Sequence, residues 1–285
     1  MMDRFAGKIA WITGASSGIG AALAAELDAR GAHLILSGRR EDALAAVAAT
    51  LARPCLVLPF DTTDAAALPN VVDAAVAWRG GIDLLVNNAG ISQRSLAIDT
   101  DLAVYRTIME VDFFAPVQLT QRVLPHMVAR GGGHIAVTSS VAGKVGAPLR
   151  SGYSAAKHAL LGWFDAVRAE VETAYGIAVS VILPGSVRTD IAVNALSATG
   201  GIRGRSDANI ANGMPAEQAA RQIADALADK TREIVVAEGQ EAQALHLRRH
   251  DPDTLFALLA EEGRRLAAAR SAGGADWQPD PTQIR

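Results

Sequence analysis

The chain has 285 residues, half of them hydrophobic, which suits one large α/β domain or two small ones with a buried core. Lys and Arg number 27 against 30 Asp and Glu, so the net charge of −3 gives no general attraction to nucleic acid or to an anionic membrane. Residues 1–8 carry charges, and no apolar run approaches the ~18 residues of a membrane span. We therefore expect a cytoplasmic protein without nucleic-acid or membrane partners.

Cysteine and histidine residues indicate neither a disulfide framework nor a metal site. The single cysteine, Cys55, lies among apolar residues, which favours a small buried hydrophobe over a reactive thiol. The six histidines are scattered. His246 and His250 lie four apart on a predicted helix, but Arg248 and Arg249 beside them favour a solvated basic face over a zinc site.

Apolar runs rich in strand formers alternate along the chain with helical patterns. The runs predict strands over 9–12, 33–37, 55–58, 82–86, 134–138, 177–183 and 233–236. The helical patterns cover 21–30, 41–51, 65–78, 101–130, 152–175, 215–227 and 240–270, with a possible break near Asp112 and Pro116. Such alternation predicts a three-layer, doubly wound α/β fold of the Rossmann type, with a seven-stranded parallel sheet.

No internal repeat or low-complexity linker marks a second domain. We expect residues 1–240 to form one domain and residues 241–285 to add a helical extension and a tail from Ser271. Polar, glycine-containing sequence within 190–213 is long for a loop and predicts a substrate lid. The extension after Gln240 has two alternative roles, capping a substrate pocket or mediating assembly.

The first predicted strand leads into a glycine-rich turn that holds Gly14, Gly18 and Gly20. Glycines at such a turn allow a tight bend, close approach to a phosphate, and packing of the next helix on the strand, while the helix N-terminus attracts the anion. The spacing G-x-x-x-G-x-G differs from the dinucleotide fingerprint G-x-G-x-x-G. A simple connecting turn is the alternative.

The second predicted strand ends at Gly38, followed by Arg39 and Arg40. In a βαβ nucleotide-binding unit, an acidic residue about twenty positions past the glycines binds the adenosine ribose hydroxyls, whereas an arginine accommodates a 2′-phosphate. Because Gly38 lacks a carboxylate and Arg39 supplies a cation, NADP is favoured and NAD stays possible. A solvated pair of arginines is the alternative.

Candidate chemistry lies between residues 134 and 157. The strand predicted over 134–138 delivers the hydroxyls of Ser139 and Ser140 into a loop, after which Tyr153 and Lys157 stand about one helical turn apart on one face. A cation beside a phenol favours the phenolate, so this set is suited to proton transfer. Taken alone, a Tyr-x-x-x-Lys spacing is more typical of a surface pair on an amphipathic helix.

The chain resembles the short-chain dehydrogenase/reductase family over residues 5–240. Four motifs carry the resemblance, in the family's order: the glycine turn at 13–20, Asn-Asn-Ala-Gly at 87–90, the set of Ser140, Tyr153 and Lys157, and Pro-Gly at 184–185. Residues 140–146 and 152–160 look closest to the branch that contains dehydrogenase/reductase member 7-like and 11β-hydroxysteroid-dehydrogenase-like proteins.

The resemblance implies catalytic roles for named residues. The family's catalytic serine lies thirteen residues before the tyrosine, which selects Ser140 over Ser139. Tyr153 would exchange a proton with the substrate oxygen, Ser140 would bind that oxygen, and Lys157 would hold the nicotinamide ribose. Implied cofactor contacts are Gly14, Ser16, Ser17, Gly18, Ile19, Gly20, Arg39, Asp61, Asn88, Ala89, Gly90, Tyr153, Lys157, Pro184, Gly185, Val187 and Thr189.

One residue departs from the family pattern. Where the family usually has an asparagine that anchors a water in a proton relay, this chain has Asp112. An ionised carboxylate accepts hydrogen bonds but cannot donate them as an amide does. Asp112 is therefore a candidate member of the catalytic set whose pairing with Lys157 would alter the pH dependence of turnover.

These features together predict an NADP(H)-dependent oxidoreductase that interconverts an apolar secondary alcohol and a carbonyl. The alternatives are an NAD-dependent dehydrogenase and a nucleotide-binding regulator or scaffold with little turnover. The resemblance also implies a homodimer or homotetramer that assembles through helix faces within 112–129 and 153–175. Candidate substrate-pocket residues are Gln93, Ser95, Val145 and Arg150.

Overall fold

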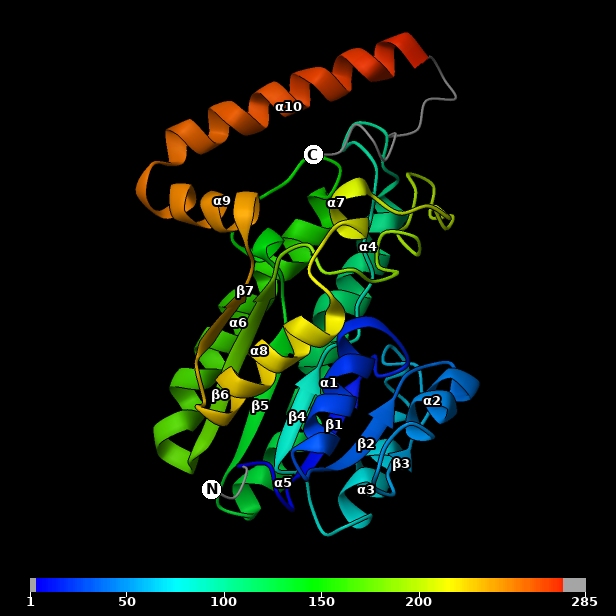
Figure 1. Ribbon diagram of the computed structural model, residues 1–285, viewed down its shortest axis with the longest axis vertical. Coiled ribbons are helices and arrows are strands. Elements are labelled where there is room, and N and C mark those ends of the chain that lie inside the picture. The colour runs from blue at the N-terminus through cyan, green and yellow to red at the C-terminus, as the bar shows by residue number, and fades with distance from the viewer. Residues whose placement is uncertain (1–3, 274–285) are drawn as a thin grey trace.

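A computed structural model of the chain describes residues 4–273. Seven parallel strands form one sheet in the order β3-β2-β1-β4-β5-β6-β7, with helices on both faces (Figure 1). The predicted fold class is therefore confirmed. The strands are β1 (Ile9–Thr13), β2 (His33–Ser37), β3 (Leu56–Val57), β4 (Leu84–Asn87), β5 (Gly133–Thr138), β6 (Ile177–Pro184) and β7 (Glu233–Val236).

Two helical layers cover the sheet. One apolar core lies beneath α1 (Gly18–Ala29), α2 (Glu41–Ala48) and α8 (Ala216–Ala228). The other lies beneath α3 (Leu68–Ala77), α5 (Ala115–Ala129) and α6 (Ser151–Tyr175). The remaining helices are α4 (Leu102–Met109), α7 (Ala208–Ala211), α9 (Gly239–His250) and α10 (Pro252–Gly273).

The first strand shows why both faces of the sheet are buried. Side chains alternate between the faces of a strand, so Ala10 and Ile12 enter the core beneath α1, whereas Ile9 and Trp11 enter the core beneath α6. Trp11 is fully buried, and its indole N–H donates to the Ser37 hydroxyl at 2.9 Å. A continuous apolar run is what a parallel strand between two helical layers requires.

Strand order reverses next to β1, which pairs with β2 on one side and with β4 on the other. At such a switch point the loops leave the sheet toward opposite faces and open a crevice at the carboxyl ends of the strands. The predicted motifs all follow the carboxyl ends of β1, β2, β4, β5 and β6. The topology therefore gathers them at one edge of the sheet.

Most predicted elements match to within about three residues, and three differences bear on the core and the site. The strand predicted over 55–58 is confined to Leu56–Val57, and Cys55 is only partly buried at the edge of the core. The helix predicted over 101–130 is divided by a π-helical turn, η1 (Glu110–Phe114), so the possible break near Asp112 is confirmed. The first helix begins at Gly18 rather than at residue 21.

The helix predicted over 240–270 consists of two helices, α9 and α10. The chain turns at Asp251, whose carboxylate accepts a hydrogen bond from the Thr254 N–H at 3.2 Å, and Pro252 begins the next helix. This is ordinary helix-start chemistry that hydrophobic periodicity does not show. The two helices lie across the carboxyl edge of the sheet (Figure 1), and Leu266 packs against Leu149 there.

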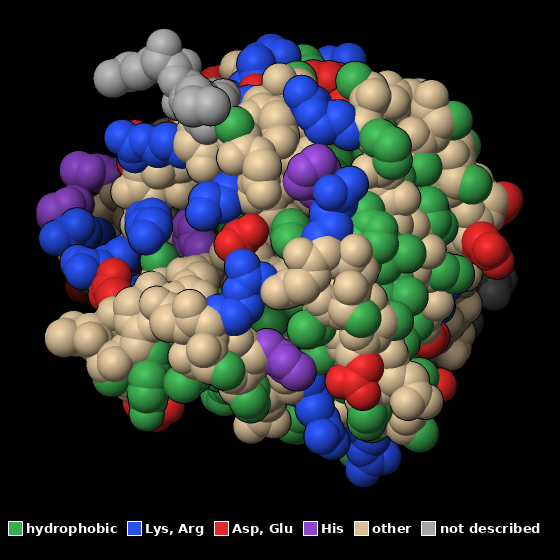
Figure 2. All heavy atoms as spheres, turned by 90° about the horizontal axis from the view of Figure 1, so that it is seen from below, with side chains coloured by type: hydrophobic (Ala, Val, Ile, Leu, Met, Phe, Trp, Pro, Cys, Tyr) green, Lys and Arg blue, Asp and Glu red, His purple; other side chains and the backbone are tan. Residues whose placement is uncertain are grey.

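The near-balance of acidic and basic residues in the sequence is also seen on the surface. Figure 2 shows basic and acidic side chains interspersed with apolar and other polar groups on the face it presents. Within residues 4–273, no helix is both long and apolar enough to cross a membrane.

Phe164 of α6 is expected to contribute strongly to the stability of the fold. Phe164 is fully buried at the middle of that helix, so Phe164→Ala is expected to lower the free energy of unfolding by about 3–5 kcal/mol through lost burial and a residual cavity. Chemical denaturation measures the change. Tyr175→Ala, at the exposed end of the same helix, is the control and should cost less than about 1 kcal/mol. Similar losses in the two variants would contradict the packing of α6.

Candidate active site

A cavity of about 1850 Å³ opens along the carboxyl edge of the sheet. Its walls come from the segments that follow β1, β2, β4, β5 and β6, from residues 187–214, and from α9 and α10. Ligand pockets commonly enclose about 300–1,000 Å³. The cavity is therefore large enough for an extended cofactor and a substrate together.

The glycine turn forms one end of the cavity. Gly14 and Gly18 have φ angles of +66° and +55°, a region that side chains rarely adopt. A Cβ on Gly20 would collide with the carbonyl oxygen of Gly14 and the side chain of Asn88. The three glycines thus permit a turn that packs tightly on the segment after β4 and opens the N-terminus of α1 to the cavity.

Asn88 joins the carboxyl ends of three strands. Its backbone N–H donates to the Thr13 hydroxyl at 3.0 Å, and its side-chain amide donates to the Thr13 carbonyl at 3.2 Å. Its side-chain oxygen accepts from the Thr138 hydroxyl at 3.2 Å. Asn88 therefore fixes the spacing between the glycine turn after β1 and the reactive hydroxyls after β5.

Two arginines follow β2, and the carboxylate of Asp61 follows the neighbouring β3. Arg39 and Arg40 are exposed and line the cavity, and Arg40 donates to the Ser16 hydroxyl at 3.3 Å. Burial opposes the charge of Asp61, but hydrogen bonds from Thr63 and the nearby Arg39 leave the pKa of this carboxyl below its usual range. The arginines are thus placed to meet an anion beside the turn.

The two serines after β5 have different environments. Ser139 is buried, and its hydroxyl donates to the backbone carbonyl of Lys157 at 2.9 Å. The Ser140 hydroxyl accepts from the Ala142 N–H at 3.0 Å and donates to the Pro184 carbonyl at 3.3 Å. Ser139 therefore ties β5 to α6, while Ser140 keeps only a long donor contact that a ligand oxygen can replace.

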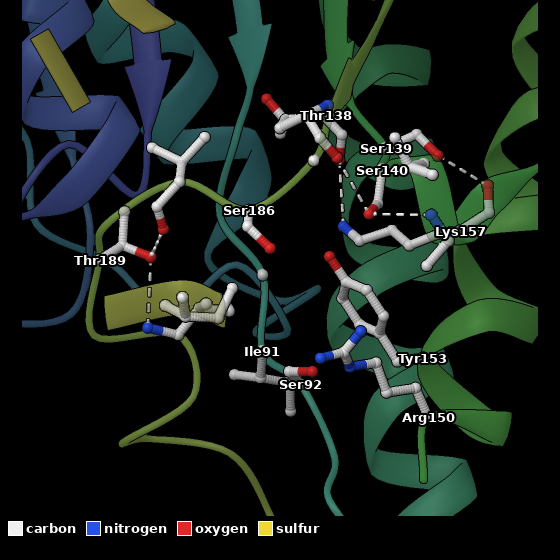
Figure 3. Close-up of a pocket in the computed structure, with 18 of the residues that line it drawn as sticks. Ile91, Ser92, Thr138, Ser139, Ser140, Arg150, Tyr153, Lys157, Ser186 and Thr189 are labelled. Carbon is white, nitrogen blue, oxygen red and sulfur yellow. Dashed lines mark hydrogen bonds between the residues drawn. The ribbon is translucent and has the colours of Figure 1, made fainter. Parts of the chain in front are cut away.

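Tyr153 and Lys157 project from the first turns of α6 into the cavity. Lys157 Nζ lies 5.5 Å from the centroid of the Tyr153 ring and donates to the Thr138 carbonyl at 3.0 Å. Figure 3 shows the tyrosine hydroxyl and the lysine amine directed at the same space, with Ser140 at its edge. Ser140, Tyr153 and Lys157, which the sequence predicted as the catalytic set, therefore lie together in the structure.

Asp112 lies behind this group, on the π-helical turn η1. It is fully buried, accepts from the Ile91 N–H at 2.8 Å, and places its other oxygen 3.4 Å from Lys157 Nζ. Burial raises the pKa of the Asp112 carboxyl, and the Lys157 ammonium and the Ile91 N–H oppose that rise. The contact with Lys157 that the sequence suggested is present.

Nearly every predicted site residue lines the one cavity. Those that do are Gly14, Ser16, Ser17, Gly18, Ile19, Arg39, Asp61, Asn88, Ala89, Gly90, Ser140, Tyr153, Lys157, Pro184, Gly185, Val187 and Thr189. Gly20 and Asp112 stand behind its wall, where they shape the turn and contact Lys157.

The expected substrate-pocket residues need a correction. Val145 and Arg150 line the cavity, but Gln93 and Ser95 are buried behind it. Gln93 accepts from the Gly152 N–H at 2.8 Å, and the Ser95 hydroxyl bonds that of Thr100 at 2.7 Å. Both side chains hold loops together, because their polar atoms meet loop partners that the linear sequence did not identify.

Sequence reasoning missed a cluster of ionic side chains on the cavity wall. Asp207, which precedes α7, contacts Arg94, Arg150 and Arg203. Arg94 and Asp207 are 113 positions apart, so no local motif could have paired them.

The cavity fits a dinucleotide cofactor. A turn in which only glycine is tolerated opens a helix N-terminus toward it, as a pyrophosphate requires. Arginines stand at the end of β2, and small residues, Ala89 and Gly90, follow β4 where an extended ligand would pass. Among the described residues, no group of His, Cys, Asp and Glu side chains has the arrangement of a metal site.

Comparisons with known proteins agree with this geometry. The family model for short chain dehydrogenases matches residues 8–199. Dehydrogenase/reductase SDR family member 7B of Bos taurus is 39% identical over 264 residues, which cover 89% of this chain and 81% of that protein. The predicted resemblance to the family and to its member-7-like proteins is thereby confirmed.

Solved structures show the same fold. A short-chain dehydrogenase from Streptomyces avermitilis superposes with a TM-score of 0.75 at 27% identity, covering 93% of this chain and 99% of that one. A short chain dehydrogenase/reductase from Burkholderia phymatum, in complex with NAD, gives 0.74 at 24% identity over 95% and 97% of the two chains. This chain belongs to the short-chain dehydrogenase/reductase family and is an oxidoreductase that acts on CH–OH groups with NAD(P).

Proposed function

We propose that the protein is an NADP(H)-dependent oxidoreductase that interconverts an apolar secondary alcohol and a carbonyl, with Tyr153 as the acid and base. The observation that carries the proposal is the meeting of Ser140, Tyr153 and Lys157 at the cavity into which the glycine turn opens. Bound NADPH would supply the hydride, and the protein would supply binding, orientation and the proton.

In carbonyl reduction, Ser140 would exchange its long bond to the Pro184 carbonyl for the substrate oxygen. The Tyr153 hydroxyl would deliver its proton to that oxygen as negative charge develops there. Lys157, held by the Thr138 carbonyl, would favour the phenolate left behind. Alcohol oxidation would use the same groups in reverse, with the phenolate taking the proton.

Leucines on the C-terminal helices support an apolar substrate. Leu255, Leu259 and Leu266 line the cavity together with Leu149 and Val145. We infer that α10 caps the substrate end, which was one of the two roles considered for the extension. For assembly we keep the proposal of a homodimer or homotetramer that uses exposed faces of α5 and α6.

Tyr153→Phe tests the assigned reaction. The variant keeps the ring and removes the proton donor, so kcat for a panel of ketones with NADPH should fall by about 10²–10⁴-fold. Cofactor binding and thermal unfolding should stay near the wild-type values. Tyr175→Phe, on the exposed end of the same helix, is the matched control. Wild-type protein that binds cofactor without turnover would favour the scaffold alternative.

Arg39→Ala tests the choice of cofactor. Because charge-assisted bonds to a phosphate are worth about 1.5–3 kcal/mol, the dissociation constant for NADP⁺ should rise about 10–100-fold, while that for NAD⁺ should change little. Calorimetric titration measures both constants. Arg79→Ala removes an exposed arginine outside the cavity and controls for net charge. Unchanged affinity for NADP⁺ in Arg39→Ala would defeat the assignment and leave NAD as the cofactor.

Asp112→Asn tests the influence of the buried carboxylate. Above its raised pKa, Asp112 is ionised and opposes the effect of Lys157, so the carboxylate disfavours the phenolate that alcohol oxidation requires. The amide of the variant cannot carry that charge, and we expect the rising limb of the kcat/KM profile to move to lower pH by about one unit or less. Asp165→Asn on exposed α6 surface is the control. Superimposable profiles for wild type and variant would show that Asp112 does not affect proton transfer.

A further inference from the structure

One buried carboxylate is shared by three arginines beside the proposed reaction centre. The Asp207 side chain is completely buried, and its Oδ2 lies 2.6 Å from Arg94 Nε and 3.5 Å from Arg150 Nη2. Arg203 bonds its other oxygen, Oδ1. Among these four side chains, the single carboxylate of Asp207 therefore contacts three guanidinium groups.

Arg94 is buried and lies close enough to Arg150 and Arg203 for their positive charges to repel its own. Burial first, and then repulsion by Arg150 and Arg203, lowers the pKa of its guanidinium to about 10, although Asp207 acts in the opposite direction. Asp207 attracts the charge of Arg94, but the same carboxylate also contacts Arg150 and Arg203.

The arginines differ in how completely they are bound. Arg94 donates to Asp207, to the Ser92 hydroxyl at 2.6 Å and to the Gln93 carbonyl at 2.7 Å, and its side chain is 2% exposed. Arg150 is 19% exposed, and its contact with Asp207 is long. The guanidinium that can accept a further partner is therefore that of Arg150.

Arg150 also has the right position for a substrate contact. It stands immediately before α6, three residues ahead of Tyr153, and lines the same cavity. Figure 3 shows its guanidinium alongside the tyrosine ring, on the side of Ile91 and Ser92. A group bound by Arg150 would therefore be part of the substrate whose reacting oxygen contacts the Tyr153 hydroxyl.

We propose that Arg150 binds an anionic group of the substrate, a carboxylate or a phosphate-type oxyanion, and that it is a specificity-determining residue. Planar guanidinium groups match such anions with two parallel hydrogen bonds. Because Leu149 and the leucines of α10 line the neighbouring wall, the substrate combines this anionic group with an apolar body. The inference rests on the proposed function, since it concerns the carbonyl compound on which Tyr153 acts.

Matched pairs of ketones test the inference. One pair is 4-oxopentanoate and its methyl ester, and the other is 2-oxopropylphosphonate and its dimethyl ester. We expect kcat/KM for at least one anion to exceed that for its neutral ester by at least about tenfold. The preferred pair identifies which anion the site takes. Arg150→Gln should reduce that preference by at least about tenfold, chiefly through a higher KM for the anion, and Arg150→Lys should keep part of it.

A binding measurement makes the test independent of turnover. With saturating NADP⁺ no ketone can be reduced, so calorimetric titration of each anion reports binding alone. Binding should weaken at least about tenfold in Arg150→Gln and stay unchanged in Arg79→Gln, which removes an exposed cation outside the cavity. Anions that neither bind nor react better than their esters would overturn the inference.

Two other outcomes separate the possible failures. Neutral ketones reduced in a Tyr153-dependent manner, without preference for anions, would overturn the inference and leave the proposed function intact. A loss in Arg150→Gln that is equal for anion and ester, together with a lower Tm, would show that Arg150 only holds the Asp207 segment in place. Absence of reduction with every ketone would count against the proposed function itself.

Discussion

The buried ammonium of Lys157 is the group around which the site is arranged. Its side chain is only 4% exposed, and a cation at that depth needs partners to offset the loss of water. The Thr138 carbonyl at the end of β5 and the carboxylate of Asp112 supply them. Since Thr138 also binds Asn88, this arrangement couples the lysine to the strand ends that hold the glycine turn. The π-helical turn η1 also helps to provide a partner for the lysine. A π-helical turn contains more residues than an α-helical turn and so changes the direction in which its side chains point, and Asp112 in this turn lies against Lys157.

The sequence predicts those parts of the molecule that depend on periodicity and on local motifs. Alternating apolar runs specify seven parallel strands, and the rule that loops follow strand ends predicts that Gly14, Asn88, Ser140 and Pro184 meet. The short β3 and the break at Asp251 were not predicted, because pairing partners and helix caps override hydrophobic pattern at element ends.

Contacts between distant segments lie beyond such reasoning. Nothing in the local sequence distinguishes the buried Gln93 from a pocket residue, or shows that Asp207 will pair with Arg94 from 113 positions away. Both facts depend on how residues 190–214 fold back over the cavity, with isolated bridges from Gln93 to Leu196 and from Val187 to Met214. Tertiary context therefore decides which polar side chains are structural and which remain available to a ligand.

Charge is distributed unevenly along the cavity. The glycine turn, the N-terminus of α1 and Arg39 offer N–H donors and a cation at one end, and Arg150, beside Arg94 and Asp207, offers a cation at the other. Between them, Asp112 lies 3.4 Å from Lys157 at the centre where Tyr153 would exchange its proton. A cavity built in this way favours ligands with anionic groups on both sides of the reacting atoms: a cofactor held by its phosphates and a substrate held by an oxyanion. Only the first of these is expected of every nucleotide-dependent oxidoreductase, so the second is where the substrate specificity of this chain should be sought.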